Sequence, residues 1–202
     1  LEYRYPLWVF VDGTLHVAYY DATAGGLVLL RVRDGGAGPA RALRVAGGRS
    51  GRVRPGDDAG RFVDLAVDAS GVTHLAFLNR TRLAVRYVQV DPAGAIAVAE
   101  TVESGLQGGA RRLLGADVEL LLGPEGPRVA YQDGTDASVR VAARGAGGAW
   151  TARRVAGEPG QAGQGFYVDL VPAPAGGVFG VSYRFDLRER EDANGVAFFE
   201  GP

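Results

Sequence analysis

Short apolar runs, rich in valine, leucine and aromatic residues, alternate with glycine- and aspartate-rich turns along the whole chain. Such runs are typical of β-strands, and the Gly and Asp residues between them supply the positive φ angles and side-chain caps that tight turns need. No segment sustains a helical period, and Gln107–Leu114 is a single short candidate for a helix. The pattern therefore predicts an all-β fold.

Four segments share one pattern, a small residue followed by an aromatic one, with spacings of 58, 54 and 52 residues between the small residues. Each copy is preceded by an apolar strand with a tight turn and followed by a third strand. Three copies also have a fourth strand. The small residues are Ala18, Ala76, Ala130 and Ser182; the third strands are expected at 27–32, 83–90, 138–143 and 196–199, and the fourth at 40–45, 96–102 and 150–155.

Four-stranded antiparallel meanders of this kind are typical of β-propeller blades. We expect one domain over 1–202, with blades near 6–56, 57–115, 116–165 and 166–202. The small residue lets neighbouring blades approach, and the aromatic residue fills the wider outer gap. The last copy lacks a fourth strand, and pairing of residues 1–5 with it would close the ring. A β-sandwich, part of a larger propeller, and self-association of an incomplete ring are the alternatives.

The pattern Asp-x-x-Gly-x-x-His-(Val/Leu)-Ala-(Tyr/Phe), present at residues 68–77, resembles the repeat of bacterial extracellular β-propellers. It is also distantly similar to the Asp-box repeat of sialidase-type propellers. The Asp-box has an aromatic residue, usually Trp, soon after its turn, and no copy in this chain has Trp there. The resemblance implies a propeller but leaves the activity open, because propellers host lectins, hydrolases, lyases and scaffolds.

Composition narrows the function classes. All 22 basic residues are arginine, and with 23 acidic residues they give a net charge of −1, which disfavours nucleic-acid binding. The chain has no Cys, no Met and no apolar run long enough to span a membrane. The arginine, alanine and glycine bias suggests a GC-rich bacterium, and the missing initial Met suggests one domain of a larger protein. We expect a secreted or cell-surface location.

Long polar loops gather on one side of the predicted blades, because loops between second and third strands share a face with the links between blades. We call this the long-loop face. Loops on a rigid scaffold often carry function. The candidate ligand-binding residues on this face are Asp21, Asp57, Asp58, Arg80, Arg112, Asp133, Asp136 and Asp186.

Two sharper interpretations of the charged residues compete with structural ones. Arg80, Arg112, Asp58 and Tyr167 would form a sialidase-like carboxylate clamp, or the charged groups would form ion pairs between blades. The loop 133–136 would offer two carboxylates to Ca²⁺, or would be a capped hairpin.

The two histidines, His16 and His74, recur at one repeat position, which indicates a structural role. With two His and no Cys, no metal site is expected.

No catalytic motif is evident, and the catalytic residues are unknown at this point. We therefore expect a non-catalytic binding or protein-interaction module without a cofactor, with a protein or glycan partner on the long-loop face. The alternative is a glycan-directed protein, either a lectin or a sialidase-like glycosidase. A glycosidase would need two carboxylates about 5–10 Å apart.

Overall fold

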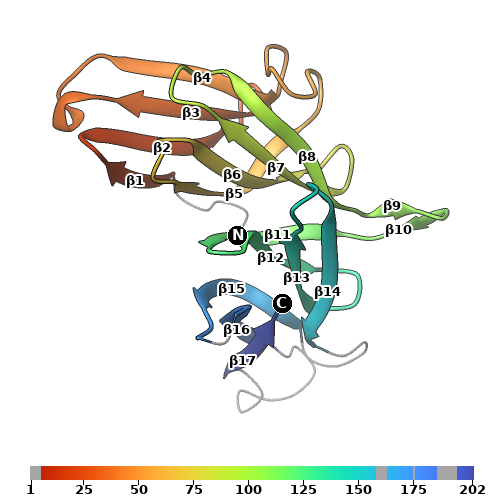
Figure 1. Cartoon of the computed structure of the whole chain (residues 1–202). Helices are drawn as coiled ribbons and strands as arrows, with labels where there is room; N and C mark the ends of the chain where they lie inside the picture. Colours follow the sequence, from red (N-terminus) through yellow and green to blue (C-terminus); the bar gives the residue numbers. More distant parts are fainter. Residues whose placement is uncertain (1–5, 158–162, 175, 186–194) are drawn as a thin grey trace. The chain divides into compact units, whose positions relative to one another are not determined.

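The computed structural model describes residues 6–157, 163–174, 176–185 and 195–202, and apart from one 3-10 turn at Asp34–Gly36 its regular elements are β-strands (Figure 1). The chain divides into two compact units, residues 1–101 and 102–202. The all-β prediction is confirmed, and its strand positions agree with those observed to within a few residues.

Unit 1 contains two four-stranded antiparallel sheets whose strands lie in chain order. The first is β1-β2-β3-β4 and the second is β5-β6-β7-β8, whose last strand continues into unit 2. Their bounds are β1 Leu7–Val11, β2 Thr14–Asp21, β3 Gly26–Val32, β4 Ala40–Gly47, β5 Ala59–Val67, β6 Thr73–Asn79, β7 Ala84–Val90 and β8 Ile96–Ser104.

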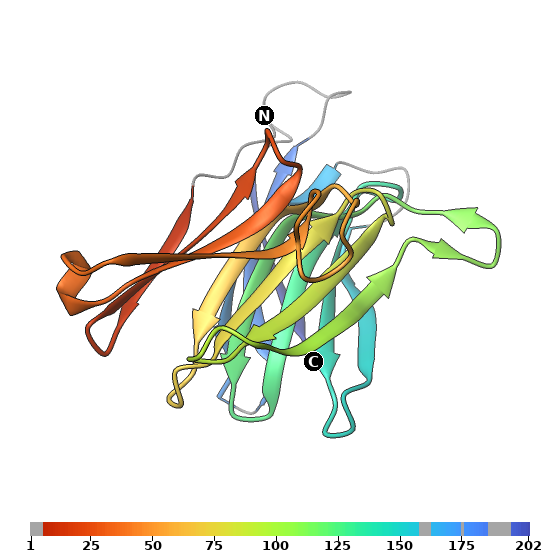
Figure 2. The same ribbon diagram turned by 90° about the horizontal axis from the view of Figure 1, so that it is seen from above.

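Unit 2 contains the four-stranded sheet β11-β12-β13-β14, the three-stranded sheet β15-β16-β17 and a small hairpin, β9-β10, that projects away from the four-stranded sheet (Figure 2). The hairpin occupies most of the segment considered as a helix, because Gly108 and Gly109, at φ +57° and +79°, form its turn. The bounds are β9 Leu106–Gln107, β10 Ala110–Arg111, β11 Leu114–Gly123, β12 Gly126–Asp133, β13 Ser138–Arg144, β14 Trp150–Ala156, β15 Gly163–Pro172, β16 Val178–Phe185 and β17 Gly195–Gly201.

The repeated small residue lies at the centre of each sheet, as its proposed packing role requires. Ala18, Ala76 and Ala130 are fully buried, and Ser182 is 1% exposed. Each unit has its own core. In unit 1 the core includes Leu27, Leu29, Val45, Phe77 and Val88; in unit 2 it includes Val139, Val141, Val168, Leu170 and Phe199.

Closure of a ring stays a prediction, because residues 1–5 lie outside the described residues. The single-domain boundaries and self-association also stay predictions. In the three-stranded sheet, Val196 and Phe198 of β17 are 63% and 80% exposed, while Phe199 between the sheets is buried. Within the described residues, no helix is long and apolar enough to cross a membrane.

Candidate functional site

Three strands carry the same β-bulge. We call β5, β11 and β15, the first strands of their sheets, the inner strands; in unit 2, β11 and β15 contact each other. In each of them the pairing register slips just before an acidic residue. The residue two positions before that acid has a positive φ angle: 49° at Phe62, 52° at Asp117 and 53° at Tyr167. Such bulges are built-in features that re-aim a side chain.

A glycine with a positive φ angle starts each bulge, and at two of the three positions a neighbouring residue also crowds the place of a side chain. Gly60 has φ +116°, and a Cβ atom added to it would lie 2.6 Å from the Cβ atom of Leu27. Gly165 has φ +92°, and its added Cβ atom would lie 3.1 Å from the side chain of Gln132. Both the backbone angle and the contact therefore require glycine.

The acidic residue after the bulge is Asp64 in β5, Glu119 in β11 and Asp169 in β15. Asp64 and Glu119 pair with the buried small residues Ala76 and Ala130, whereas Asp169 pairs with Val181. The side chains of Asp64 and Glu119 are half-buried, and Asp169 is exposed.

Sequence reasoning missed these carboxylates, because it aligned the repeats on their second strands. The signal that could have found them is Gly-x-x-Val-(Asp/Glu)-Leu, which occurs at 60–65, 115–120 and 165–170.

One hydrogen bond joins the two bulges of unit 2, and a second ties β12 to the start of the β15 bulge. The Asp117 carboxylate accepts the backbone N–H of Tyr167 at 2.5 Å. The amide of Gln132 donates to the carbonyl oxygen of Gln164 at 2.7 Å. Glu119 lies two residues after Asp117, and Asp169 lies two residues after Tyr167. The hydrogen bond between Asp117 and Tyr167 therefore holds β11 and β15 together next to the two acidic residues.

The long-loop residues of unit 1 form a network of their own. Tyr20 donates its hydroxyl to Asp58 at 2.6 Å, and Arg61 and Arg80 lie 3.3 and 4.0 Å from the same carboxylate. Burial, together with the hydrogen bond to Asp58, raises the pKa of Tyr20. Arg61 also lies 4.9 Å from the centre of the Tyr20 ring. This network joins the first sheet to the second.

Asp57 is buried beside this network. It accepts hydrogen bonds from Asn79 at 2.9 Å and from Arg82 at 3.1 Å. Burial alone would raise the pKa of Asp57, but these two hydrogen bonds together with the charges of Arg82 and Arg54 outweigh it and lower the pKa. Asp21 caps its own turn by accepting the N–H of Ala24 at 3.0 Å and lies 3.4 Å from Arg44. These acids hold links and turns in place.

In unit 2, Arg112 is surrounded by acids. It donates to Asp133, lies 3.2 Å from Asp136 and lies 3.9 Å from Glu103. The loop is further tied by the N–H of Leu113, which donates to the Thr135 hydroxyl at 2.7 Å. Ion pairing is thus the observed arrangement of Arg112, and of Arg80 with Asp58 in unit 1.

The calcium interpretation stays a prediction. Asp133 and Asp136 are both bonded to the Arg112 guanidinium, and no group of three or more His, Asp or Glu side chains in the described segments is placed to hold a metal ion. Asp186, the remaining candidate, lies outside the described residues. That the candidate residues of the long-loop face bind a ligand also stays a prediction.

Both histidines are buried and hydrogen-bonded. His74 lies between the Tyr87 hydroxyl, at 2.5 Å, and the Asp68 carboxylate, at 3.1 Å. His16 bonds the Thr73 hydroxyl at 2.9 Å. These contacts fit the structural role expected from the repeat.

No protein-family model matches the sequence, and no curated protein matches it. Solved structures do share its fold. An exo-β-1,3-galactanase from Clostridium thermocellum aligns with a TM-score of 0.56 and 12% identity over 96% of this chain and 45% of its own. An endo-arabinase from Bacteroides thetaiotaomicron aligns with a TM-score of 0.51 and 10% identity over 96% of this chain and 73% of its own. A bifunctional GH43-CE protein from Bacteroides eggerthii aligns with a TM-score of 0.52 and 12% identity over 95% of this chain and 25% of its own.

The likeness shows the fold, which is of the β-propeller type and is confirmed to that extent. This chain spans 45% of the galactanase and 25% of the bifunctional protein. The finer resemblance to sialidase Asp-box propellers is not supported, since the similar structures include family-43 glycoside hydrolases. The prediction of a non-catalytic binding module is wrong, because the fold is shared with enzymes that act on glycans.

Proposed function

We propose that this chain is a glycan-degrading enzyme domain, a glycoside hydrolase that uses Glu119 and Asp169. The observation that carries the proposal is the acidic residue placed at the same position after the bulge in β11 and β15. Glycoside hydrolysis needs two carboxyl groups, one to protonate the leaving oxygen and one to act as a base or nucleophile. The similar structures include a galactanase, a galactosidase and an arabinase, so galactose- or arabinose-containing glycans are the proposed substrates.

The burial of the two carboxyl groups suggests how the roles divide. Glu119 is half-buried and Asp169 is exposed. A carboxyl group removed from water keeps its proton more readily, so we assign the proton-donating role to Glu119. The exposed Asp169 would then act either as the base that activates the attacking water or as the nucleophile. Asp64 occupies the equivalent position in unit 1 and is tested in parallel.

The test is sugar release from β-1,3-galactan and from arabinan by the purified protein. Glu119→Gln and Asp169→Asn should each lower kcat by about 10²–10⁴-fold, the usual contribution of acid–base catalysis. Glu200→Gln and Asp12→Asn, which change exposed acids on β17 and in the first hairpin, should leave kcat unchanged. Thermal melting of each variant checks that it is folded.

Glycan binding by the wild-type protein without turnover would overturn the proposal, as would full activity in Glu119→Gln. Asp64→Asn is measured beside them, and its loss or retention of activity tells whether the third acid of the motif takes part.

A further inference from the structure

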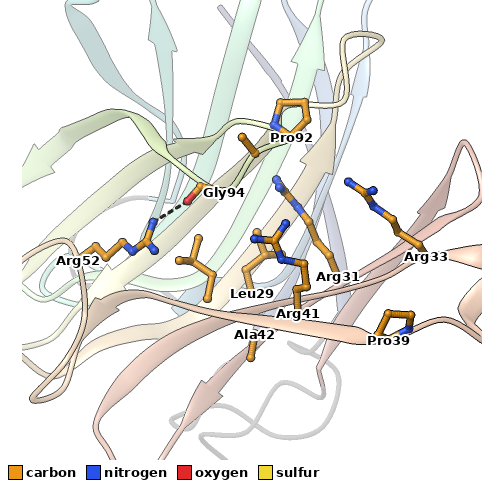
Figure 3. A pocket seen from close by; sticks show the side chains of 11 residues that line it. Leu29, Arg31, Arg33, Pro39, Arg41, Ala42, Arg52, Pro92 and Gly94 are labelled. Carbon is orange, nitrogen blue, oxygen red and sulfur yellow. Dashed lines mark hydrogen bonds between the residues drawn. The ribbon is translucent and has the colours of Figure 1, made fainter.

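A pocket of about 230 Å³ lies in unit 1 (Figure 3). It is formed by β3, β4, the link that follows β4 and the turn between β7 and β8. The volume is below the roughly 300–1,000 Å³ of pockets that enclose a drug-sized ligand, so it suits one small group. The lining residues are Leu29, Arg31, Arg33, Pro39, Arg41, Ala42, Leu43, Arg52, Pro92, Ala93 and Gly94.

The pocket is strongly cationic. Four arginines line it, and none of the other lining residues is acidic. Arg31 of β3 and Arg41 of β4 are direct cross-strand partners. Arg33 directly follows the end of β3, and its backbone is still extended, which places it on the same side as Arg31. The three side chains extend toward the turn that carries Pro92 and Gly94 (Figure 3). Because the whole chain has a net charge of −1, this concentration is local.

Within the described part of the chain, the arginines of this pocket form no hydrogen bond or ion pair with a carboxylate, in contrast to Arg80 and Arg112 on the long-loop face. Arg31 donates to the carbonyl oxygens of Asp91 and Val90 at 2.6 and 2.9 Å and to the Thr73 hydroxyl at 2.7 Å, and its Nε atom is buried without a partner. Arg52 donates to the Gly94 carbonyl oxygen at 2.7 Å. All of these acceptors are neutral, so the positive charges remain uncompensated by the contacts they make.

Arg33 and Arg41 make even fewer contacts. Both side chains are exposed, and neither forms a hydrogen bond or ion pair with any residue that the structure describes. Burial lowers the pKa of Arg31, and the charges of Arg41 and Arg33 lower it further, against the opposing effect of Asp91. The Asp91 carboxylate is itself engaged by the N–H of Ala95 at 2.7 Å. Asp91 therefore offsets part of the charge on Arg31, while Arg33 and Arg41 remain without a counter-charge in contact with them among the described residues.

We propose that this pocket binds an oxyanion group, such as a sulfate or carboxylate. Guanidinium groups pair with oxyanions through two parallel hydrogen bonds, and Arg41 and Arg33 have their donors available for this geometry. Arg31 supplies a third positive charge, and its hydrogen bonds to β6, to β7 and to the turn after β7 hold its side chain in place. The oxyanion is carried by an acidic glycan or is a free inorganic ion. The proposal does not depend on the hydrolysis assigned to Glu119 and Asp169.

The test is isothermal titration calorimetry of the protein in low-salt buffer free of phosphate. The probes are sodium sulfate, digalacturonate and a sulfated galactose disaccharide. Binding of at least one probe at 1:1 is expected, with at least a tenfold loss in Arg41→Gln and in Arg33→Gln. Arg153→Gln, which removes one exposed arginine of β14 in unit 2, is the matched control and should bind as the wild type does.

The relative affinities identify the source of the anion. Tighter binding of a glycan probe than of sulfate indicates an acidic glycan, and equal binding indicates a free inorganic ion. Glu119→Gln should bind as tightly as the wild type, which separates this site from catalysis. The proposal is overturned if none of the three probes binds, or if Arg153→Gln weakens binding as much as Arg41→Gln does.

Discussion

The Asp117 carboxylate accepts the backbone N–H of Tyr167 at 2.5 Å, and both residues have positive φ angles at equivalent positions of neighbouring inner strands. One bulge thus holds the other. A hydrogen bond to a charged acceptor contributes more than one between neutral groups. It also fixes the backbone two residues before Glu119 and Asp169, so a stability contact and the proposed site depend on the same side chain.

Asp117→Ala should therefore lower the free energy of unfolding by about 2–3 kcal/mol, since it removes a charged acceptor and places alanine at a positive φ angle. Asp117→Asn keeps an acceptor oxygen and tolerates this backbone angle, so its loss should be clearly smaller. Urea unfolding of both variants checks the difference. Equal losses would show that the bond to Tyr167 contributes little.

The sheets could be predicted from the sequence because strand and turn signals are local. Apolar runs between Gly- and Asp-rich turns placed all four third strands and all three fourth strands. The bulges could not be placed in this way. The glycine at position 60 is required by contact with Leu27, which lies on a strand of the preceding sheet, and no local pattern contains that contact.

Some of the charged residues could likewise be predicted from the sequence, whereas their partners could not. Sequence reasoning placed Asp57, Asp58 and Arg80 together, but their partners Asn79, Arg82 and Tyr20 follow from the packing of links on strands. The arginine pocket was missed because Arg31 and Arg41 are ten positions apart, and they face each other only in the observed β3–β4 register. The pairing register of two strands is set by the turn and by core packing, so it cannot be predicted from composition.

Glu103 forms a nearly buried ion pair with Arg140 in unit 2. It accepts two hydrogen bonds from Arg140, at 2.8 and 2.9 Å, and also accepts the hydroxyl of the buried Tyr131. Both charged side chains are nearly buried, at 13% and 12% exposure. Glu103→Gln should lower the free energy of unfolding by about 2–4 kcal/mol, because Arg140 is left without its counter-charge.

The matched control for this pair is Arg44→Gln, which breaks the exposed ion pair with Asp21. Exposed pairs contribute little, so this variant should unfold at the same urea concentration as the wild type. If the two variants lose equal stability, burial does not set the strength of these pairs.

Arg41→Glu should make the protein more stable while it abolishes oxyanion binding. In the wild type, Arg31 and Arg41 are like charges at a directly paired position, which is destabilising, whereas an opposite-charge pair there stabilises by about 0.2–1 kcal/mol. A glutamate at position 41 turns the repulsion into an attraction, and Arg41→Gln should fall between the two. Urea unfolding at low and high salt is the measurement, since salt should shrink the difference. A destabilised Arg41→Glu variant would mean that the arginines do not repel each other.

Protonation of His16 should destabilise the protein below neutral pH. Burial, reinforced by the charge of Arg31, lowers the pKa of His16 to about 4 from 6.5. Between these values the unfolded chain binds a proton that the folded chain does not, so stability is full above pH 6.5 and is lost as the pH falls. From pH 7.5 to 4.5 the loss should be about 2–3 kcal/mol.

His16→Gln removes the titrating group while keeping a polar side chain near Thr73, so its unfolding free energy should change much less over the same range. The window stops at pH 4.5 because Asp68 titrates below it. Burial would raise the pKa of Asp68, but hydrogen bonds from Ser70, His74 and Val72 together outweigh burial and lower this pKa to about 2, so Asp68 contributes its own loss only below its ordinary pKa of 3.8. Urea unfolding at half-unit pH steps gives both slopes. Parallel slopes in the two proteins would show that the acid sensitivity arises from a group other than His16.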